Sequence, residues 1–182
     1  MCKHSVCKIV ICSVYHLMSR CQTWYDLEMK TPDYPSKIAT AKVTNPLPVP
    51  ETCPHCGGSV SWVDNRVIYG QSYGDWPYAY ICADCRSYVG LHPFTNIPLG
   101  TLATAAIRKA RSLNKPYFEA LFKTGKMDRS TAYTKLAEKL SIPVEGCHFG
   151  WFDEERCHKA AVAAREIFLE FDSKKSCRKI QH

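Results

Sequence analysis

The sequence Cys53-Pro54-His55-Cys56-Gly57-Gly58 contains a Cys-x-x-Cys pair, and Cys82-Ala83-Asp84-Cys85 contains a second one. A Cys-x-x-Cys turn places two sulfurs on one side of a tight loop, so two facing turns complete a tetrahedral set of thiolates. Gly57 and Gly58 suit the positive φ and the uncrowded amides of such a loop. The spacing therefore predicts a zinc ribbon, with one structural Zn²⁺ bound by Cys53, Cys56, Cys82 and Cys85.

Disulfides are the competing interpretation, because the 182 residues include 11 cysteines and small secreted domains are rich in them. We expect zinc instead, since the number of cysteines is odd and no cleavable signal sequence is expected at the N-terminus. A disulfide within Cys-x-x-Cys also closes too short a loop to stabilise a fold. The cysteines at positions 2, 7, 12 and 21 lack a metal-site spacing and are interpreted as ordinary thiols.

The composition is that of an ordinary folded protein, with 46% hydrophobic and 23% charged residues. The net charge of +7 is uneven, because residues 98–147 hold most of the basic excess while residues 51–97 are slightly acidic. A basic segment suits a polyanionic partner, although moderate charge also serves solubility. The apolar run at residues 9–18 is too short to cross a bilayer as a helix, so we expect no membrane partner and a cytoplasmic location.

The chain divides by composition into four parts. Residues 1–50 are a poorly defined N-terminal extension that ends in a Pro-rich linker, for which extended chain is expected. Residues 51–97 form the zinc ribbon, and residues 98–172 form a helical subdomain packed on it. Residues 173–182 form a basic flexible tail. The predicted fold class is α+β, a small antiparallel zinc ribbon followed by a compact four-helix region.

Strand-forming residues predict three or so short antiparallel strands in the ribbon. Residues 60–69 have the pattern of a hairpin, with its turn at Asp64-Asn65, and residues 76–81 and 87–91 lead into and out of the second cysteine pair. The many aromatic side chains here permit two interpretations. They can stack on unpaired bases, but aromatic residues more often cover the thin core of a small domain.

Caps and apolar periodicity predict four helices after the ribbon. The first is capped by Thr101 and ends near Leu113, and the second begins at Pro116 and stops at Gly125. The third is capped by Asp128 or Ser130 and closed by Pro143. The fourth starts after Asp153, and its apolar stripe consists of Cys157, Ala160, Ala161, Ala164, Ile167, Phe168 and Phe171.

Several motifs together resemble a known family. They are Cys53 through Gly58, Ile68-Tyr69-Gly70, Tyr73-Gly74, Trp76-Pro77, Tyr80 through Cys85, Tyr88-Val89-Gly90, His92-Pro93, Pro98 through Ala103, Arg129, Ala132-Tyr133, Leu136-Ala137, Cys147 through Phe152, and Cys157. The sequence is similar to the zinc-finger-containing domain family of unknown function, which occurs in phages and bacterial genomes, over about residues 51–162. The resemblance implies a four-cysteine zinc site and a phage or prophage setting. It implies no established activity.

Outside the ribbon, Cys147-His148 and Cys157-His158 suggest a second metal site, but a buried thiol and surface imidazoles are the more ordinary explanation. His55 is expected beside the metal or exposed, and a lone His92 is weak evidence for catalysis. The sequence contains no Gly-rich phosphate loop, no Gly-x-Ser-x-Gly elbow and no His-Glu-x-x-His motif. We therefore expect a protein that acts by binding and is not an enzyme.

Nucleic acid, either DNA or RNA, is the expected partner. The residues expected to neutralise phosphates are Arg108, Lys109, Arg111, Lys115, Lys123, Lys126 and Arg129. Residues 117–124 and 130–140 also suggest a helix-turn-helix, with Ser130 to Lys139 as the recognition helix. These charges are equally well explained as solvated helix faces. One alternative is a phage effector that docks on a host nuclease, polymerase or defence factor, and a second is a metal-dependent nucleic-acid enzyme.

Overall fold

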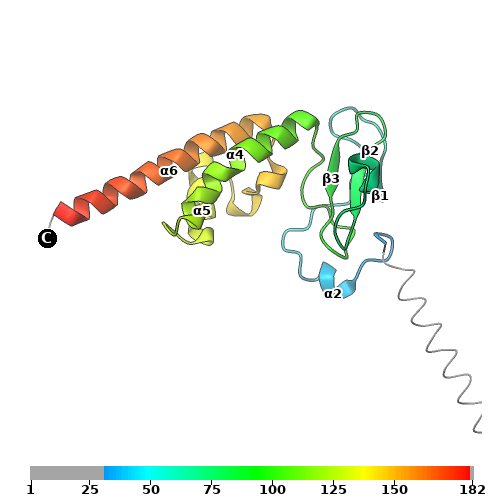
Figure 1. The fold of residues 1–182 in the computed structure, drawn as a ribbon, viewed down its shortest axis with the longest axis horizontal. Coiled ribbons are helices and arrows are strands. Elements are labelled where there is room, and N and C mark those ends of the chain that lie inside the picture. The colour runs from blue at the N-terminus through cyan, green and yellow to red at the C-terminus, as the bar shows by residue number, and fades with distance from the viewer. Residues whose placement is uncertain (1–30, 181–182) are drawn as a thin grey trace, which may run out of the picture.

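A computed structural model of the chain describes residues 31–180 and shows a three-stranded sheet followed by helices (Figure 1). The sheet and the helices lie side by side, and each has its own core. The ribbon core gathers Cys53, Tyr80, Cys82, Val89, Leu91 and Leu102. The predicted α+β fold is confirmed. The apolar run at residues 9–18 and the early cysteines lie outside the described residues.

The sheet is antiparallel and consists of β1 (Val60–Asp64), β2 (Tyr78–Cys82) and β3 (Tyr88–Gly90), in that order. Its central strand β2 is the most buried, since four of its five residues are enclosed. Val60 faces Cys82 across the β1–β2 pair. Because the first cysteine pair lies just before β1 and the second forms the β2–β3 turn, this register brings the two cysteine turns to the same end of the sheet.

The predicted hairpin within residues 60–69 is wrong. β1 is followed by a one-turn helix, α3 (Arg66–Tyr69), and β1 pairs instead with β2 across a longer loop. Asp64 Oδ1 accepts a hydrogen bond from the Arg66 amide at 2.8 Å, which starts the helical turn. The Asn65 side chain then holds the loop, because its Nδ2 donates to the Tyr73 carbonyl at 2.9 Å and its Oδ1 accepts from the Tyr73 amide at 3.0 Å.

The linker lies against the ribbon. It contains a one-turn helix, α2 (Lys37–Thr40), where extended chain was expected, and the Ser36 side chain caps it. The Ser36 amide donates to the Phe94 carbonyl at 2.8 Å, and the Trp62 indole donates to Asp33 at 3.1 Å. Asp33 and Ser36 therefore attach this part of the linker to the ribbon.

Three α-helices and two 3₁₀ turns form the helical region, where four helices were expected. They are α4 (Ala105–Lys123), α5 (Arg129–Leu140), η1 (Val144–Gly146), η2 (Phe149–Trp151) and α6 (Glu154–Ile180). Thr104 caps α4 in place of the predicted Thr101. The predicted first and second helices are one helix, with Pro116 in its interior. Buried side chains lie on both sides of the proline, Ile107 and Ala110 before it and Phe118 and Leu121 after it. Their packing keeps the helix continuous although Pro116 cannot donate a backbone hydrogen bond.

The helical core lies among α4, α5, α6 and η2, and its largest fully buried side chains are Phe118, Phe152, Leu121 and Leu136. The predicted caps of the last two α-helices are confirmed, because Asp128 accepts from the Thr131 amide and Asp153 from the Arg156 amide. Ala160 and Ala164 are fully buried on the predicted stripe of α6. Their small side chains let α6 pack closely along α4 (Figure 1).

α6 continues to Ile180, so residues 173–180 extend this helix instead of forming a separate tail. The reason is that residues 154–180 contain neither glycine nor proline to end it. The helix projects beyond α4 and α5 at its C-terminal end (Figure 1). Within the described residues, no helix combines the length and the hydropathy that crossing a bilayer needs.

The ribbon and the helical region meet where Gly100 approaches Gly150. The two backbones are so close that a Cβ at Gly100 would collide with the Gly150 carbonyl. The Thr101 amide donates to that carbonyl at 3.0 Å. Arg111 of α4 closes the contact, because its guanidinium donates to the Phe152 carbonyl at 2.9 Å and to the Thr101 carbonyl at 3.2 Å.

Pro116→Ala is expected to raise the free energy of unfolding by about 1–2 kcal/mol. Proline in a helix interior costs about 3 kcal/mol, partly offset because it also restricts the unfolded chain. Urea denaturation followed by far-UV circular dichroism measures the change. Ser112→Ala, at another exposed position of α4, is the control and should change stability by less than about 0.5 kcal/mol. A loss of stability in Pro116→Ala would contradict the expectation.

Candidate metal centre

The four ribbon cysteines come together at one end of the sheet. Their sulfurs all lie within 4.8 Å of one another, and the Cys53–Cys85 and Cys56–Cys82 sulfurs are each 3.5 Å apart. Four thiolates around a tetrahedral Zn²⁺ at about 2.3 Å lie about 3.8 Å apart. A disulfide would need about 2.05 Å, and all four thiols are free. The cluster can therefore hold one zinc ion.

Backbone hydrogen bonds shape both cysteine turns. In the first turn the Gly57 amide donates to the Cys53 carbonyl at 2.9 Å, and the Cys53 amide donates to the Gly58 carbonyl at 2.8 Å. In the second turn the Cys82 amide donates to the Ser87 carbonyl at 2.9 Å. These bonds hold the backbone of each turn in the conformation that carries the cysteines.

The two glycines of the first turn have different roles. Gly57 has a φ of 77°, the left-handed conformation expected from the sequence. At Gly58 the requirement is space, because a Cβ there would collide with the Asp84 carboxylate and lie 3.1 Å from the Cys82 sulfur. Gly58 thus lets the two cysteine turns approach each other.

Ser87 is a contributor to the site that the sequence did not reveal. Its side chain is fully buried, and its Oγ lies 3.1 Å from the Cys85 sulfur. Hydrogen bonds from its side chain and backbone lower the pKa of Cys85 to about 6. Since zinc binds the thiolate, these bonds favour the form of Cys85 that can bind metal. Its only sequence signal is a small polar residue two positions after the second cysteine pair.

His55 is exposed and is not part of the sulfur cluster. Its Nε2 lies 3.1 Å from the carbonyl of Leu102, which precedes α4. With four thiolates available, the coordination sphere is closed and leaves no position for a substrate. The site is therefore structural, and His55 connects it to the chain that enters the helical region.

Cys147 and Cys157 do not form a second metal site. Among the described residues, the four ribbon cysteines are the only group of three or more His, Cys, Asp or Glu side chains close enough to share an ion. Both thiols are fully buried in the helical core, and burial raises the pKa of each to about 11. His158 is exposed on α6, while the ring of His148 lies 4.7 Å from that of Trp151.

The sheet, its two cysteine turns and the closed sulfur cluster define a zinc-ribbon protein. The chain belongs to the zinc-finger-containing domain family, whose model matches residues 49–167. The family resemblance in the sequence is thereby confirmed. No curated protein and no solved structure matches the chain.

Two of the predicted phosphate-binding residues are used to hold the fold together. Arg111 makes the bonds between Thr101 and Phe152 described above, and burial lowers its pKa. Lys126 forms an ion pair with Asp172 of α6 and lies 3.5 Å from the centre of the Phe168 ring. Neither cation is free to meet a phosphate without breaking these contacts.

Lys115 and Lys123 share one carboxylate. Glu119 accepts from Lys115 at 3.3 Å and from Lys123 at 2.7 Å, and both lysines are exposed on α4. Exposed pairs of this kind contribute little to stability and are easily exchanged for another anion. The two lysines remain accessible, although their charge is partly neutralised.

Arg108, Lys109 and Arg129 have no carboxylate partner within residues 31–173. The Arg108 guanidinium lies 3.8 Å from the centre of the Tyr88 ring, and Lys109 is exposed beside it. Arg129 is exposed near the start of α5, 5.7 Å from the ring of Tyr133. The predicted basic surface is thus divided, and its cations without a carboxylate partner lie mainly at the N-terminal end of α4, where Arg108 also donates to the Ala103 carbonyl at 2.5 Å.

Proposed function

We propose that the protein binds nucleic acid through a surface where the ribbon meets the start of α4. This ribbon–α4 patch consists of Tyr69, Tyr73, Arg86, Arg108 and Lys109. Its three cations have no carboxylate partner in the part of the chain that the structure describes, and both tyrosines are 51% exposed. Arginine, lysine and exposed aromatic rings together are typical of surfaces that contact phosphates and stack on bases.

A continuous series of ring contacts is the observation that carries this proposal. Arg108 lies over the ring of Tyr88, which is 6.0 Å from that of Tyr69 in an edge-to-face arrangement. Tyr69 meets Tyr73 in the same way at 5.7 Å. Tyr69 and Tyr73 are about half exposed, so bases of a single-stranded nucleic acid can stack on these two rings while the flanking cations meet the phosphates.

The Tyr69 hydroxyl adds no negative charge to the patch. Tyr69 donates a hydrogen bond to the Tyr88 hydroxyl at 3.4 Å, which raises the pKa of Tyr69 to about 12. Arg86, on the second cysteine turn, donates to the Val67 carbonyl at 3.3 Å and so lies beside α3. The patch therefore draws on both the zinc-held ribbon and α4.

The ribbon–α4 patch is a better candidate for nucleic-acid binding than a helix-turn-helix with α5 as its recognition helix. Lys139, at the end of the expected recognition helix, pairs with Glu166 at 3.0 Å and Glu170 at 2.7 Å on α6. Glu138 is exposed on the same helix.

The closed cysteine cluster supports binding without turnover. The setting we propose is the bacterial cytoplasm of a phage host, which the family resemblance implies.

The double change Arg108→Glu with Lys109→Glu tests the patch. Affinity for single-stranded DNA and RNA, measured by fluorescence anisotropy over a range of salt concentrations, should fall by about tenfold or more at low salt. The slope of log affinity against log salt should shrink by about two, because two phosphate contacts are lost. Circular dichroism should show an unchanged fold.

Lys37→Glu with Lys42→Glu is the matched control, because it changes the net charge equally at exposed positions in and just after α2. It should leave affinity nearly unchanged. Tyr69→Leu should weaken single-strand binding by about tenfold, since one stacking contact contributes about 1–3 kcal/mol. Equal affinity and equal salt slope for the two double variants would contradict the patch and favour docking on a host protein.

A further inference from the structure

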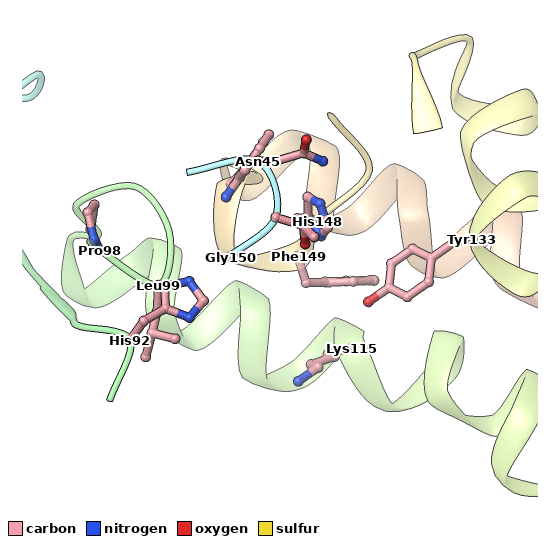
Figure 2. A pocket seen from close by; sticks show the side chains of 11 residues that line it. Asn45, His92, Pro98, Leu99, Lys115, Tyr133, His148, Phe149 and Gly150 are labelled. Atoms are coloured by element: carbon pink, nitrogen blue, oxygen red, sulfur yellow. The ribbon is translucent and has the colours of Figure 1, made fainter. Parts of the chain in front are cut away.

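A cavity of about 230 Å³ lies between the ribbon and the helical region. Five separate parts of the chain line it: the linker, the loop after β3, the helix α4, the helix α5 and the turn at η2. Figure 2 shows Asn45, His92, Lys115 and Tyr133 on different sides of this space, with His148 between them. No short sequence motif contains these residues, since only the fold brings them together.

Four of the polar side chains that line this cavity make no hydrogen bond within the described residues, whereas Lys115 pairs with Glu119. The side chains of Asn45, His92, Tyr133 and His148 make no hydrogen bond with any other residue in the described part of the chain. His92, Tyr133 and His148 are partly buried, and Figure 2 shows their side chains around the same space. A concave site with a few polar side chains around an apolar wall is the usual form of a small-ligand site.

The charge and shape of the cavity select the ligand. Its lining includes Lys115 and no acidic residue, and Glu119 lies 3.3 Å from the Lys115 ammonium. Trp151 and Leu99 supply an apolar wall on which a flat ring can lie. The volume is below the usual range of about 300–1,000 Å³ for drug-sized ligands, so a single small ligand fits.

We propose that this cavity binds one nucleoside monophosphate group. Lys115, His92 and the Tyr133 hydroxyl donate to the phosphate oxygens, and the base lies against Trp151. The ligand is either a free mononucleotide or the 5′-phosphorylated end of a strand, which share this chemistry. The site is separate from the ribbon–α4 patch, so this inference goes beyond the proposed function and does not depend on it.

Lys115→Met and Lys123→Met form a matched pair for the test. Both lysines are exposed on α4 and both pair with Glu119, but only Lys115 lines the cavity. In calorimetric titrations of the full chain with AMP and UMP, Lys115→Met should bind about tenfold more weakly, which corresponds to the loss of one charged hydrogen bond. Lys123→Met should bind like the unchanged protein.

Tyr133→Phe removes only a hydroxyl and should weaken AMP binding by about fivefold. Adenosine, which lacks the phosphate, should bind at least about tenfold more weakly than AMP. Competition by a 5′-phosphorylated oligonucleotide, but not by its 5′-hydroxyl form, identifies a strand end as the source. Competition by neither identifies the free nucleotide.

The inference is overturned if neither AMP nor UMP shows saturable binding, if adenosine binds as tightly as AMP, or if the two lysine variants have equal affinity. The variant Arg108→Glu with Lys109→Glu should keep its AMP affinity, because neither residue lines the cavity. The cavity and the patch can therefore fail independently.

Discussion

Removal of zinc is expected to unfold the ribbon and leave the helical core folded. The ribbon core is small, and two metal ligands, Cys53 and Cys82, belong to it. Binding of structural zinc contributes about 10–16 kcal/mol in small zinc domains, which is more than so thin a core supplies alone. The helical core contains none of the four ligands. The loss of structure should therefore stop near the start of α4.

Cys82→Ser or a strong chelator produces this state. Elemental analysis should find one zinc per unchanged chain and far less in the variant. Fluorescence should report exposure of Trp62 and Trp76 in the ribbon, while far-UV circular dichroism should retain most of its helical signal. Cys147→Ser, in the helical core, is the control and should keep its zinc. A fully folded ribbon without zinc would contradict the expectation.

Gly100→Ala is expected to destabilise the protein by about 3 kcal/mol. The new methyl group would collide with the Gly150 carbonyl, which is backbone and cannot rotate away as a side chain would. Moving the Gly100 and Gly150 segments apart would also lengthen the hydrogen bond from the Thr101 amide to the same carbonyl. The change falls on the junction between the ribbon and the helical region.

Urea denaturation of the zinc-bound protein measures this effect. Gly146→Ala is the matched control, because a Cβ at Gly146 meets no atom within 4 Å and its φ is not left-handed. The control should change stability by less than about 0.5 kcal/mol. Equal stability of the two variants would show that the junction moves apart at little cost.

The sequence predicted the metal site well because its signal is local. Each Cys-x-x-Cys turn forms from a few adjacent residues, and one strand pairing, Val60 with Cys82, brings the turns together. The predicted caps at Asp128 and Asp153 are local too. The errors arose where tertiary packing overrides propensity, as at Pro116 inside α4 and at Asp64-Asn65, which starts a helix instead of a hairpin turn.

The predicted phosphate-binding surface is harder to derive from the sequence. Whether a Lys or Arg side chain is available depends on residues that are far away in the sequence. Lys126 is paired by Asp172, and Arg111 is enclosed by the turn that contains Phe152. No residue near Lys126 or Arg111 in the sequence indicates these partners. In the same way, His92 and His148 look isolated in the sequence but face one cavity in the fold.

The bond between His55 and the Leu102 carbonyl joins the first cysteine turn to the entrance of α4. A molecule that has lost its ion would keep a helical body but lose this anchor and the tyrosine half of the proposed contact surface. The supply of zinc would then determine the fraction of molecules that can bind nucleic acid through the proposed surface. Zinc would be required for this binding although it does not contact the nucleic acid.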